Sequence, residues 1–153
     1  MRAIRCHAFG PPEDLLLEEI PAPVPLPNQA LIQVHAAGVN FPDLLLIRGQ
    51  YQFKPPLPFS PGLEIAGVVQ QVGSGVLRLR PGDAVVGALA AGGDSGWGGF
   101  AEAVAVDEDK LVALPAGVPM DVGACTPTTY GTTYHALHDR AQLRSGEVLL
   151  VLG

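Results

Sequence analysis

Glycine and proline break this chain into short pieces, and that limits its possible folds more than any other feature. The 153 residues include 19 glycines and 15 prolines, which lie between short apolar runs along the whole sequence. Such a pattern predicts many short strands joined by tight turns and argues against a helical bundle. Hydrophobic residues make up 48% of the chain, which is enough for the core of one ordinary domain.

The charge balance limits the partners that the chain can bind. Nine basic residues stand against fifteen acidic ones, which gives a net charge of −6. Such a chain has no electrostatic basis for binding nucleic acid or an anionic membrane surface. No apolar run approaches the roughly 18 residues that a membrane helix requires, and the first ten residues do not resemble a signal peptide. We therefore expect a cytoplasmic protein that binds neither nucleic acid nor membrane.

Short β-rich segments predict the sheet. Residues 31–36 alternate polar and apolar side chains, as a half-buried strand does. The longest expected strand, 63–72, contains Gly67, and an interior glycine indicates a bulge or a close approach of two backbones. The expected strands cover residues 3–8, 15–20, 31–36, 63–72, 84–89, 100–106 and 110–114.

Residues 40–48 carry the start and stop signals of a short helix. Asn40 can cap its start, and Pro42 and Asp43 lie in its first turn. Gly49 then ends it. Helical patterns return at 120–125 and 128–139.

Three glycine-containing segments carry a resemblance to a known family. They read Gly62-Leu63-Glu64-Ile65-Ala66-Gly67-Val68-Val69, Val72-Gly73-Ser74-Gly75-Val76 and Pro81-Gly82-Asp83-Ala84-Val85-Val86-Gly87. This pattern resembles the catalytic half of the medium-chain dehydrogenase/reductase superfamily, and within it the zinc-independent quinone oxidoreductase branch that includes zeta-crystallin. The resemblance implies a mainly β, GroES-like fold, which is a partly closed β-barrel with a few short helices.

The chain departs from the zinc-bearing members of that superfamily at two places. Those members carry Gly-His-Glu where this chain has Gly-Leu-Glu at 62–64, and a leucine side chain has no lone pair to offer a metal. They also insert a four-cysteine lobe near 92–99, where this chain has a cysteine-free glycine loop. Cys6 and Cys125 are too few for a four-thiolate site. We therefore expect no metal site.

Two further patterns are weaker. The glycine loop 92–99 does not match a phosphate-binding fingerprint, because a strand is expected after it; Trp97 either edges the cleft or anchors this loop. His135 and His138 share a helix face. Two histidines alone do not make a zinc site, and we assign them no acidic or thiol partner, so we interpret them as a solvated face.

The resemblance also divides the chain into parts. It implies a GroES-like catalytic domain at 1–125, a connecting helix region at 126–146, and the first strand of a truncated nucleotide-binding Rossmann domain at 147–153. An apolar strand that ends in glycine is how a dinucleotide-binding unit begins. The alternative is that 147–153 is the last strand of a complete small domain. In a truncated enzyme, the fragment alone is expected to be inactive, and a homodimer requires the missing domain.

The resemblance places Asn40 and Asp43 at the catalytic cleft, in the pattern Asn-Phe-x-Asp. Both are expected to have catalytic roles, and Asn40 is also expected beside the nicotinamide ribose. The alternative interpretation is helix capping, which is compatible with function because an N-cap lies at a rigid helix start. Glu64 lies near the metal in the zinc enzymes, and without a metal we expect it to be structural.

Tyr51 and Thr132 complete the expected site. Related quinone reductases carry a pocket tyrosine at the position of Tyr51, where the hydroxyl donates to the substrate or the ring stacks on a quinone. Some relatives have a second tyrosine where this chain has Leu45. Residues 130–137 are similar to a helix of that family in which a threonine reaches the nicotinamide, so the resemblance implies that Thr132 contacts the cofactor. The alternatives are a tyrosine half-buried beneath the proline-rich loop and a threonine hydroxyl bonded to its own helix.

The resemblance implies the catalytic domain of an NADPH-dependent, zinc-independent quinone oxidoreductase. The resemblance alone supplies NADPH, which the missing domain would mostly bind. The expected partner is a small quinone or enone. Two alternatives stay open: an ene or enoyl reductase of the same superfamily, and a non-catalytic binding or structural module.

Overall fold

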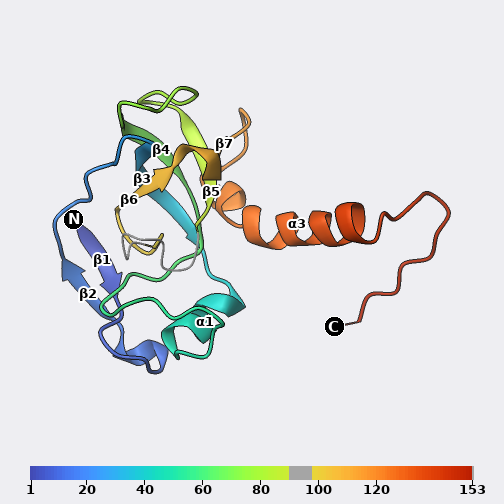
Figure 1. Cartoon of the computed structure of the whole chain (residues 1–153), viewed down its shortest axis with the longest axis horizontal. Coiled ribbons are helices and arrows are strands. Elements are labelled where there is room, and N and C mark those ends of the chain that lie inside the picture. Colours follow the sequence, from blue (N-terminus) through green and yellow to red (C-terminus); the bar gives the residue numbers. More distant parts are fainter. Residues whose placement is uncertain (90–97, 153) are drawn as a thin grey trace.

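The fold is built around one antiparallel sheet of five strands, with a two-stranded ribbon beside it (Figure 1). The computed structural model describes residues 1–89 and 98–152. The order in the large sheet is β6-β3-β4-β5-β7, and β1 with β2 forms the ribbon. The strands are β1 (Arg2–Arg5), β2 (Leu16–Glu19), β3 (Gln29–Gly38), β4 (Glu64–Val72), β5 (Ala84–Ala88), β6 (Ala103–Asp107) and β7 (Leu111–Ala113).

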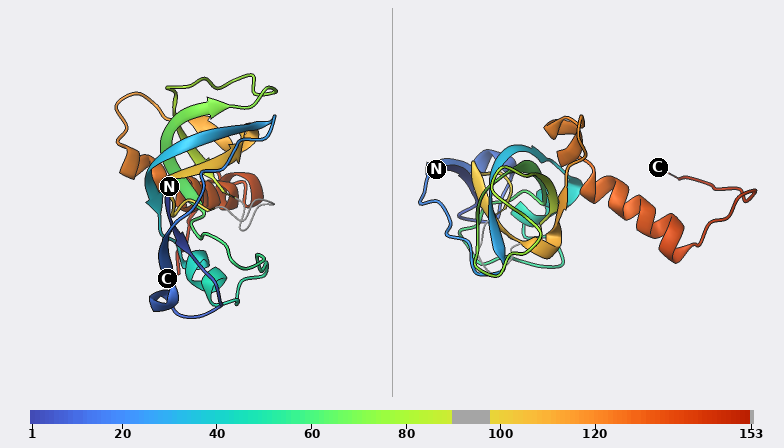
Figure 2. Two further views of the ribbon diagram at one scale, coloured as in Figure 1. Left: turned by 90° about the vertical axis from the view of Figure 1, so that its left-hand side faces the viewer. Right: turned by 90° about the horizontal axis from the view of Figure 1, so that it is seen from above.

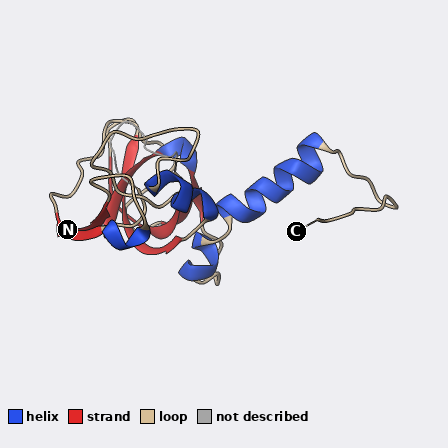
Figure 3. Ribbon diagram, turned by 90° about the horizontal axis from the view of Figure 1, so that it is seen from below, coloured by secondary structure: helices blue, strands red, loops and turns tan. Residues whose placement is uncertain are grey.

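The helical segments are short, and the last of them projects away from the sheet (Figure 3). The helix α3 continues directly into a π-helical segment, η3. The segments are η1 (Pro12–Asp14), α1 (Phe41–Ile47), η2 (Glu108–Lys110), α2 (Met120–Ala124), α3 (Pro127–Tyr134) and η3 (His135–Arg140). The prediction of a mainly β fold with a few short helices is confirmed.

The large sheet curls but does not close on itself (Figure 2). Its edge strands, β6 and β7, follow one another in the chain and are joined by η2. Gly67 lies opposite Val34, where β3 and β4 approach closely. A Cβ atom at Gly67 would lie 2.1 Å from the carbonyl oxygen of Gln33, so only glycine fits. The predicted close backbone approach at Gly67 is confirmed.

Two apolar clusters hold the domain together. The first is formed mainly by side chains of the large sheet and consists of Ala30, Ile32, Ile65, Val69, Leu79, Val85, Val104, Val106 and Leu111. The second contains Cys6, Leu46, Ile47, Phe59 and Leu63. Leu63 belongs to the second cluster and Ile65 to the first, so the intervening residue, Glu64, is held where the two clusters meet.

The first strand is shorter than predicted, and the last predicted strand has no partner within the described chain. The strand predicted over 3–8 ends at Arg5, and Cys6 makes only a single bridge to Phe59. Residues 147–152 pair with no strand in the described chain, and Val148 is 95% exposed. A strand is stable only against a neighbouring strand or a covering layer, so the apolar sequence of this segment does not suffice to form one.

Candidate active site

The site begins at the first turn of α1. Asn40 has extended backbone angles and caps the helix, and Pro42 occupies its first turn. The Asp43 carboxylate turns back and accepts a hydrogen bond from the Asn40 backbone N–H, with an N···Oδ2 distance of 2.8 Å. The predicted capping role is therefore confirmed, and the Asn40 side-chain NH₂ group makes a separate contact.

Asp43 also fixes the entry to β4. Its Oδ1 atom accepts a hydrogen bond of 3.1 Å from the Gly62 backbone N–H. Gly62 has a φ of +106°, and a Cβ atom there would lie 2.7 Å from the backbone nitrogen of Phe100. One carboxylate thus holds the start of α1 against a turn that only glycine can form.

Burial changes the acidity of Asp43, which is only 3% exposed. Loss of solvation raises the pKa of this carboxyl above its ordinary value, and the charge of Glu64 raises it further. The backbone N–H groups of Asn40, Gly62 and Leu63 oppose the rise because they stabilise the ionised form.

Glu64, the first residue of β4, connects the parts of the site and is 1% exposed. Its Oε1 atom accepts a 2.8 Å hydrogen bond from Asn40 Nδ2. Its Oε2 atom accepts a 2.7 Å hydrogen bond from the backbone N–H of Thr128, in the first turn of α3. Gly38 makes room for this carboxylate, because a Cβ atom there would lie 2.1 Å from Oε1.

Sequence reasoning did not identify this central role of Glu64 and did not single out Thr128. The available signal was a carboxylate at the start of an apolar strand. A buried carboxylate requires hydrogen-bond donors, but the sequence does not show that the donors come from 24 and 64 residues away.

Thr132 lies one helical turn beyond Thr128, on the same side of α3. Its side chain is exposed, and its hydroxyl makes no hydrogen bond within residues 1–89 and 98–152. Thr133, in contrast, donates 2.9 Å to the carbonyl oxygen of Thr129. The alternative for Thr132 is a hydroxyl bonded to the backbone of its own helix. That arrangement is found at Thr133 instead.

Tyr51 is half-buried and packs against the second apolar cluster, beyond the end of α1. Its backbone N–H donates to the carbonyl oxygen of Leu45 at 3.1 Å. The Tyr51 hydroxyl makes no hydrogen bond to the part of the chain that the structure describes, and it is not in hydrogen-bond contact with Asn40 or Glu64. The structure thus brings Asn40, Asp43 and Glu64 together, while Tyr51 and Thr132 lie at separate positions.

The sequence match agrees with this fold. Residues 26–116 match the family described as the alcohol dehydrogenase GroES-like domain. This chain belongs to that family. It is similar to quinone oxidoreductase-like protein 2 of Rattus norvegicus, with 39% identity over 98% of this chain and 41% of the relative. It is 38% identical to quinone oxidoreductase of Pongo abelii, over 100% of this chain and 45% of that protein.

A solved structure extends the comparison. The quinone oxidoreductase from Thermus thermophilus, which was also solved in complex with NADPH, matches with a TM-score of 0.79 and 32% identity. The match covers 96% of this chain and 43% of that one. This GroES-like domain therefore spans less than half the length of the curated relatives it matches.

The side chains at and beside the Gly-Leu-Glu sequence of this GroES-like domain are engaged in packing or in hydrogen bonds. Leu63 is 9% exposed and packs in the second apolar cluster. All four carboxylate oxygens of Asp43 and Glu64 accept hydrogen bonds from N–H donors. Within residues 1–89 and 98–152, no group of three or more His, Cys, Asp or Glu side chains is placed to hold a metal ion.

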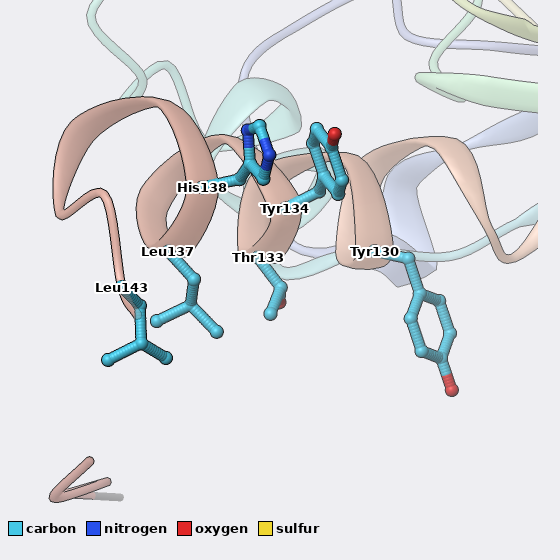
Figure 4. A pocket seen from close by; sticks show the side chains of 6 residues that line it. All are labelled: Tyr130, Thr133, Tyr134, Leu137, His138 and Leu143. Atoms are coloured by element: carbon cyan, nitrogen blue, oxygen red, sulfur yellow. The ribbon is translucent and has the colours of Figure 1, made fainter. Parts of the chain in front are cut away.

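The helix formed by α3 and η3 carries an open apolar hollow of about 470 Å³ (Figure 4). It is lined by Tyr130, Thr133, Tyr134, Leu137, His138 and Leu143. The rings of Tyr134 and His138 stack with their centroids 4.7 Å apart. Asp139 accepts from both histidines, at 3.0 Å from His135 Nδ1 and 3.1 Å from His138 Nδ1.

His135 and His138, to which the sequence assigned no acidic partner, have one in Asp139. Asp139 lies four residues after the first histidine and beside the second, a spacing that helical geometry brings together. Both histidines are largely exposed, so the predicted solvated face is confirmed. The glycine loop with Trp97 lies outside the described residues, apart from Gly98 and Gly99. In the described chain, no helix is both long and apolar enough to cross a membrane.

Proposed function

We propose that this domain supplies the catalytic part of an NADPH-dependent quinone oxidoreductase that transfers hydride without zinc. The single observation that carries the proposal is the cluster of Asn40, Asp43 and Glu64, whose carboxylate oxygens are all engaged by N–H donors. Such a cluster orders its polar groups, and each carboxylate oxygen in it already accepts a hydrogen bond. The curated relatives named quinone oxidoreductase support the same reaction class.

NADPH is proposed as the reductant because a structural neighbour was solved in complex with it. We further propose that 1–125 is the catalytic domain, 126–146 the connection, and 147–153 the first strand of a nucleotide-binding domain in the full-length protein. The exposed apolar side chains of 148–152 support that assignment, since such a segment requires a covering layer. When bound, the cofactor would supply the hydride.

The domain offers polar groups that suit a nicotinamide and a carbonyl acceptor. The half-buried amide of Asn40 has a second N–H that Glu64 does not use. The hydroxyl of Thr132 is exposed on α3. We assign Asn40 and Thr132 to cofactor binding, and Asn40 with Tyr51 to the substrate side.

Each of these residues would act by position and hydrogen bonding. Reduction of a quinone or conjugated carbonyl builds negative charge on oxygen, and donors already aimed at that oxygen lower the barrier. Tyr51 offers a hydroxyl donor and a flat ring on which a quinone stacks. Asp43 takes no proton in this account; it fixes the backbone of Asn40 and Gly62. A quinone delocalises the charge, so these groups suffice without a Lewis acid.

The proposal is tested by a substrate screen of the full-length protein. Oxidation of NADPH is followed by its near-ultraviolet absorbance with quinones, enones and enoyl thioesters as acceptors, and NADH serves as the cofactor control. Rapid turnover with quinones and little with the other acceptors is the expected result. Turnover confined to enones or enoyl thioesters would replace the proposal with an ene reductase. Absence of cofactor oxidation with every acceptor would contradict any reductase.

A further inference from the structure

We propose that Glu64 is a positioning residue that holds the amide of Asn40 at a fixed place relative to the first turn of α3. The inference rests on the function proposed above and adds to it a residue that touches neither cofactor nor substrate. Its basis is that the two oxygens of one buried carboxylate serve two different helices.

The first step in the argument is that Glu64 requires both contacts together. The side chain is 1% exposed, and no ion pair to it is found in the described chain. An ionised carboxylate removed from water must be compensated by donors. Asn40 Nδ2 and the Thr128 N–H provide this compensation, at 2.8 and 2.7 Å. The amino end of α3 adds its favourable dipole. Loss of either donor would leave part of the Glu64 carboxylate without a hydrogen bond. Both donors therefore stay in contact with the same carboxylate, which fixes the distance between them.

The second step concerns what is held. One N–H of the Asn40 amide is used by Glu64, which fixes the plane of the amide and the direction of its remaining atoms. On the other side, Thr128 fixes the first turn of α3, and Thr132 follows one turn later. Glu64 therefore sets the placement of Asn40 relative to Thr132, the two groups assigned to the cofactor.

The third step is that the surrounding backbone is built to admit this carboxylate. A Cβ atom at Gly38 would lie 2.1 Å from Oε1 and 2.8 Å from Cδ of Glu64. Gly38 pairs with Glu64 across the β3–β4 ladder. Because residue 38 is a glycine, the Glu64 side chain can occupy the space that a Cβ atom at this position would otherwise fill.

The first test variant is Glu64→Gln, which keeps shape and removes charge. A glutamine has one acceptor oxygen, so either its NH₂ group faces one of the two N–H donors or the Asn40 amide rotates to accept from it. Both outcomes disturb the placement of Asn40. We expect kcat/KM of the full-length enzyme with NADPH and a quinone to fall by about 10- to 100-fold. Glu102→Gln is the matched control, because Glu102 is an exposed glutamate paired with Arg2, and it should keep full activity.

A second variant and a rescue separate positioning from folding. Gly38→Ala retains the Glu64 charge but displaces its Oε1, and it should lower kcat/KM in the same direction. The double variant Asn40→Asp/Glu64→Gln exchanges donor and acceptor. Its glutamine NH₂ can donate to residue 40 while its oxygen accepts from Thr128. In this double variant the NMR resonance of the Thr128 backbone N–H, which Glu64→Gln displaces, should return to its wild-type position.

The decisive readout is an NMR spectrum of the ¹⁵N-labelled protein, which does not depend on turnover. In Glu64→Gln, the Asn40 side-chain NH₂ and the Thr128 backbone N–H should shift, while Glu102→Gln leaves both in place. Unmoved resonances, or full activity in Glu64→Gln, would overturn the positioning role. Absence of quinone turnover in the wild type would instead overturn the proposed function, and the NMR comparison would still decide the role of Glu64.

Discussion

The Asn40 side-chain amide and the Glu64 carboxylate are joined by a 2.8 Å hydrogen bond that links the start of α1 to the first residue of β4. Asp43 holds the backbone of the same asparagine from the other side. Two carboxylates therefore fix one asparagine, and neither keeps an oxygen without a donor. We interpret this arrangement as a preorganised polar site, in which the side chains are set before any ligand arrives.

Gly62→Ala should destabilise the domain far more than Gly82→Ala. Both glycines have positive φ, +106° and +97°. A Cβ at Gly62 would lie 2.7 Å from the Phe100 backbone nitrogen, whereas nothing lies within 4 Å at Gly82. We expect a loss of about 3 kcal/mol or more for Gly62→Ala, and about 1 to 2 kcal/mol for the control. Urea unfolding measures both. Equal losses would contradict the packing argument.

Tyr51→Phe tests the hydroxyl separately from the ring. The ring packs against the second apolar cluster, and phenylalanine preserves that packing. The free energy of unfolding should stay within about 0.5 kcal/mol of the wild type. We expect kcat with a quinone to fall by about 5- to 10-fold in the full-length enzyme, through loss of one hydrogen bond. Unchanged kcat would remove Tyr51 from the donor role and leave it a packing residue.

Thr132→Val and Thr133→Val form a matched pair on α3. The Thr132 hydroxyl is exposed and assigned to the cofactor, whereas the Thr133 hydroxyl donates to Thr129 of its own helix. We expect the Kd for NADPH of the full-length protein to rise by about 5- to 10-fold in Thr132→Val. Thr133→Val should leave it unchanged. Calorimetry decides the matter, and the reverse order would assign the contact to Thr133.

The pKa of Asp43 predicts how stability depends on pH. Burial raises this pKa above the ordinary value, so the folded state binds the proton more tightly than the unfolded state. The stability that Asp43 contributes is then fully present below the unfolded pKa of 3.8 and is lost as the pH rises through the folded pKa.

Asp43→Asn provides the comparison. The free energy of unfolding of the wild type minus that of Asp43→Asn should decrease as the pH is raised from about 4 upward. Where the wild-type Asp43 is ionised, the variant should still be less stable by about 1 to 3 kcal/mol, because its NH₂ group faces an N–H donor. Urea titrations at several pH values measure the difference. A difference that grows with pH would mean that the folded pKa is lowered.

Local signals in the sequence were enough for most of the fold. The cap at Asn40, the stop at Gly49 and the interior Gly67 each act over a few residues, and the structure confirms them. The strand predicted at 147–153 for a further domain stays a prediction, because a strand depends on neighbours that this chain alone does not supply.

The site was only partly predictable for a related reason. Asn40 and Asp43 are three residues apart, and their interaction is encoded in the helix start. Glu64 meets Thr128 across 64 residues, through the placement of α3 against the sheet. No spacing rule connects those two residues, so the sequence predicts a buried structural carboxylate at Glu64 but does not identify its donors.

Metal removal tests the central claim most directly. The full-length protein would be dialysed against a strong chelator, its zinc content measured by mass spectrometry, and NADPH oxidation with a quinone followed before and after. The Gly-Leu-Glu sequence at 62–64 and the engaged oxygens of Asp43 and Glu64 predict full turnover at substoichiometric zinc. Turnover that is lost with the metal and returns when zinc is added back would contradict the account.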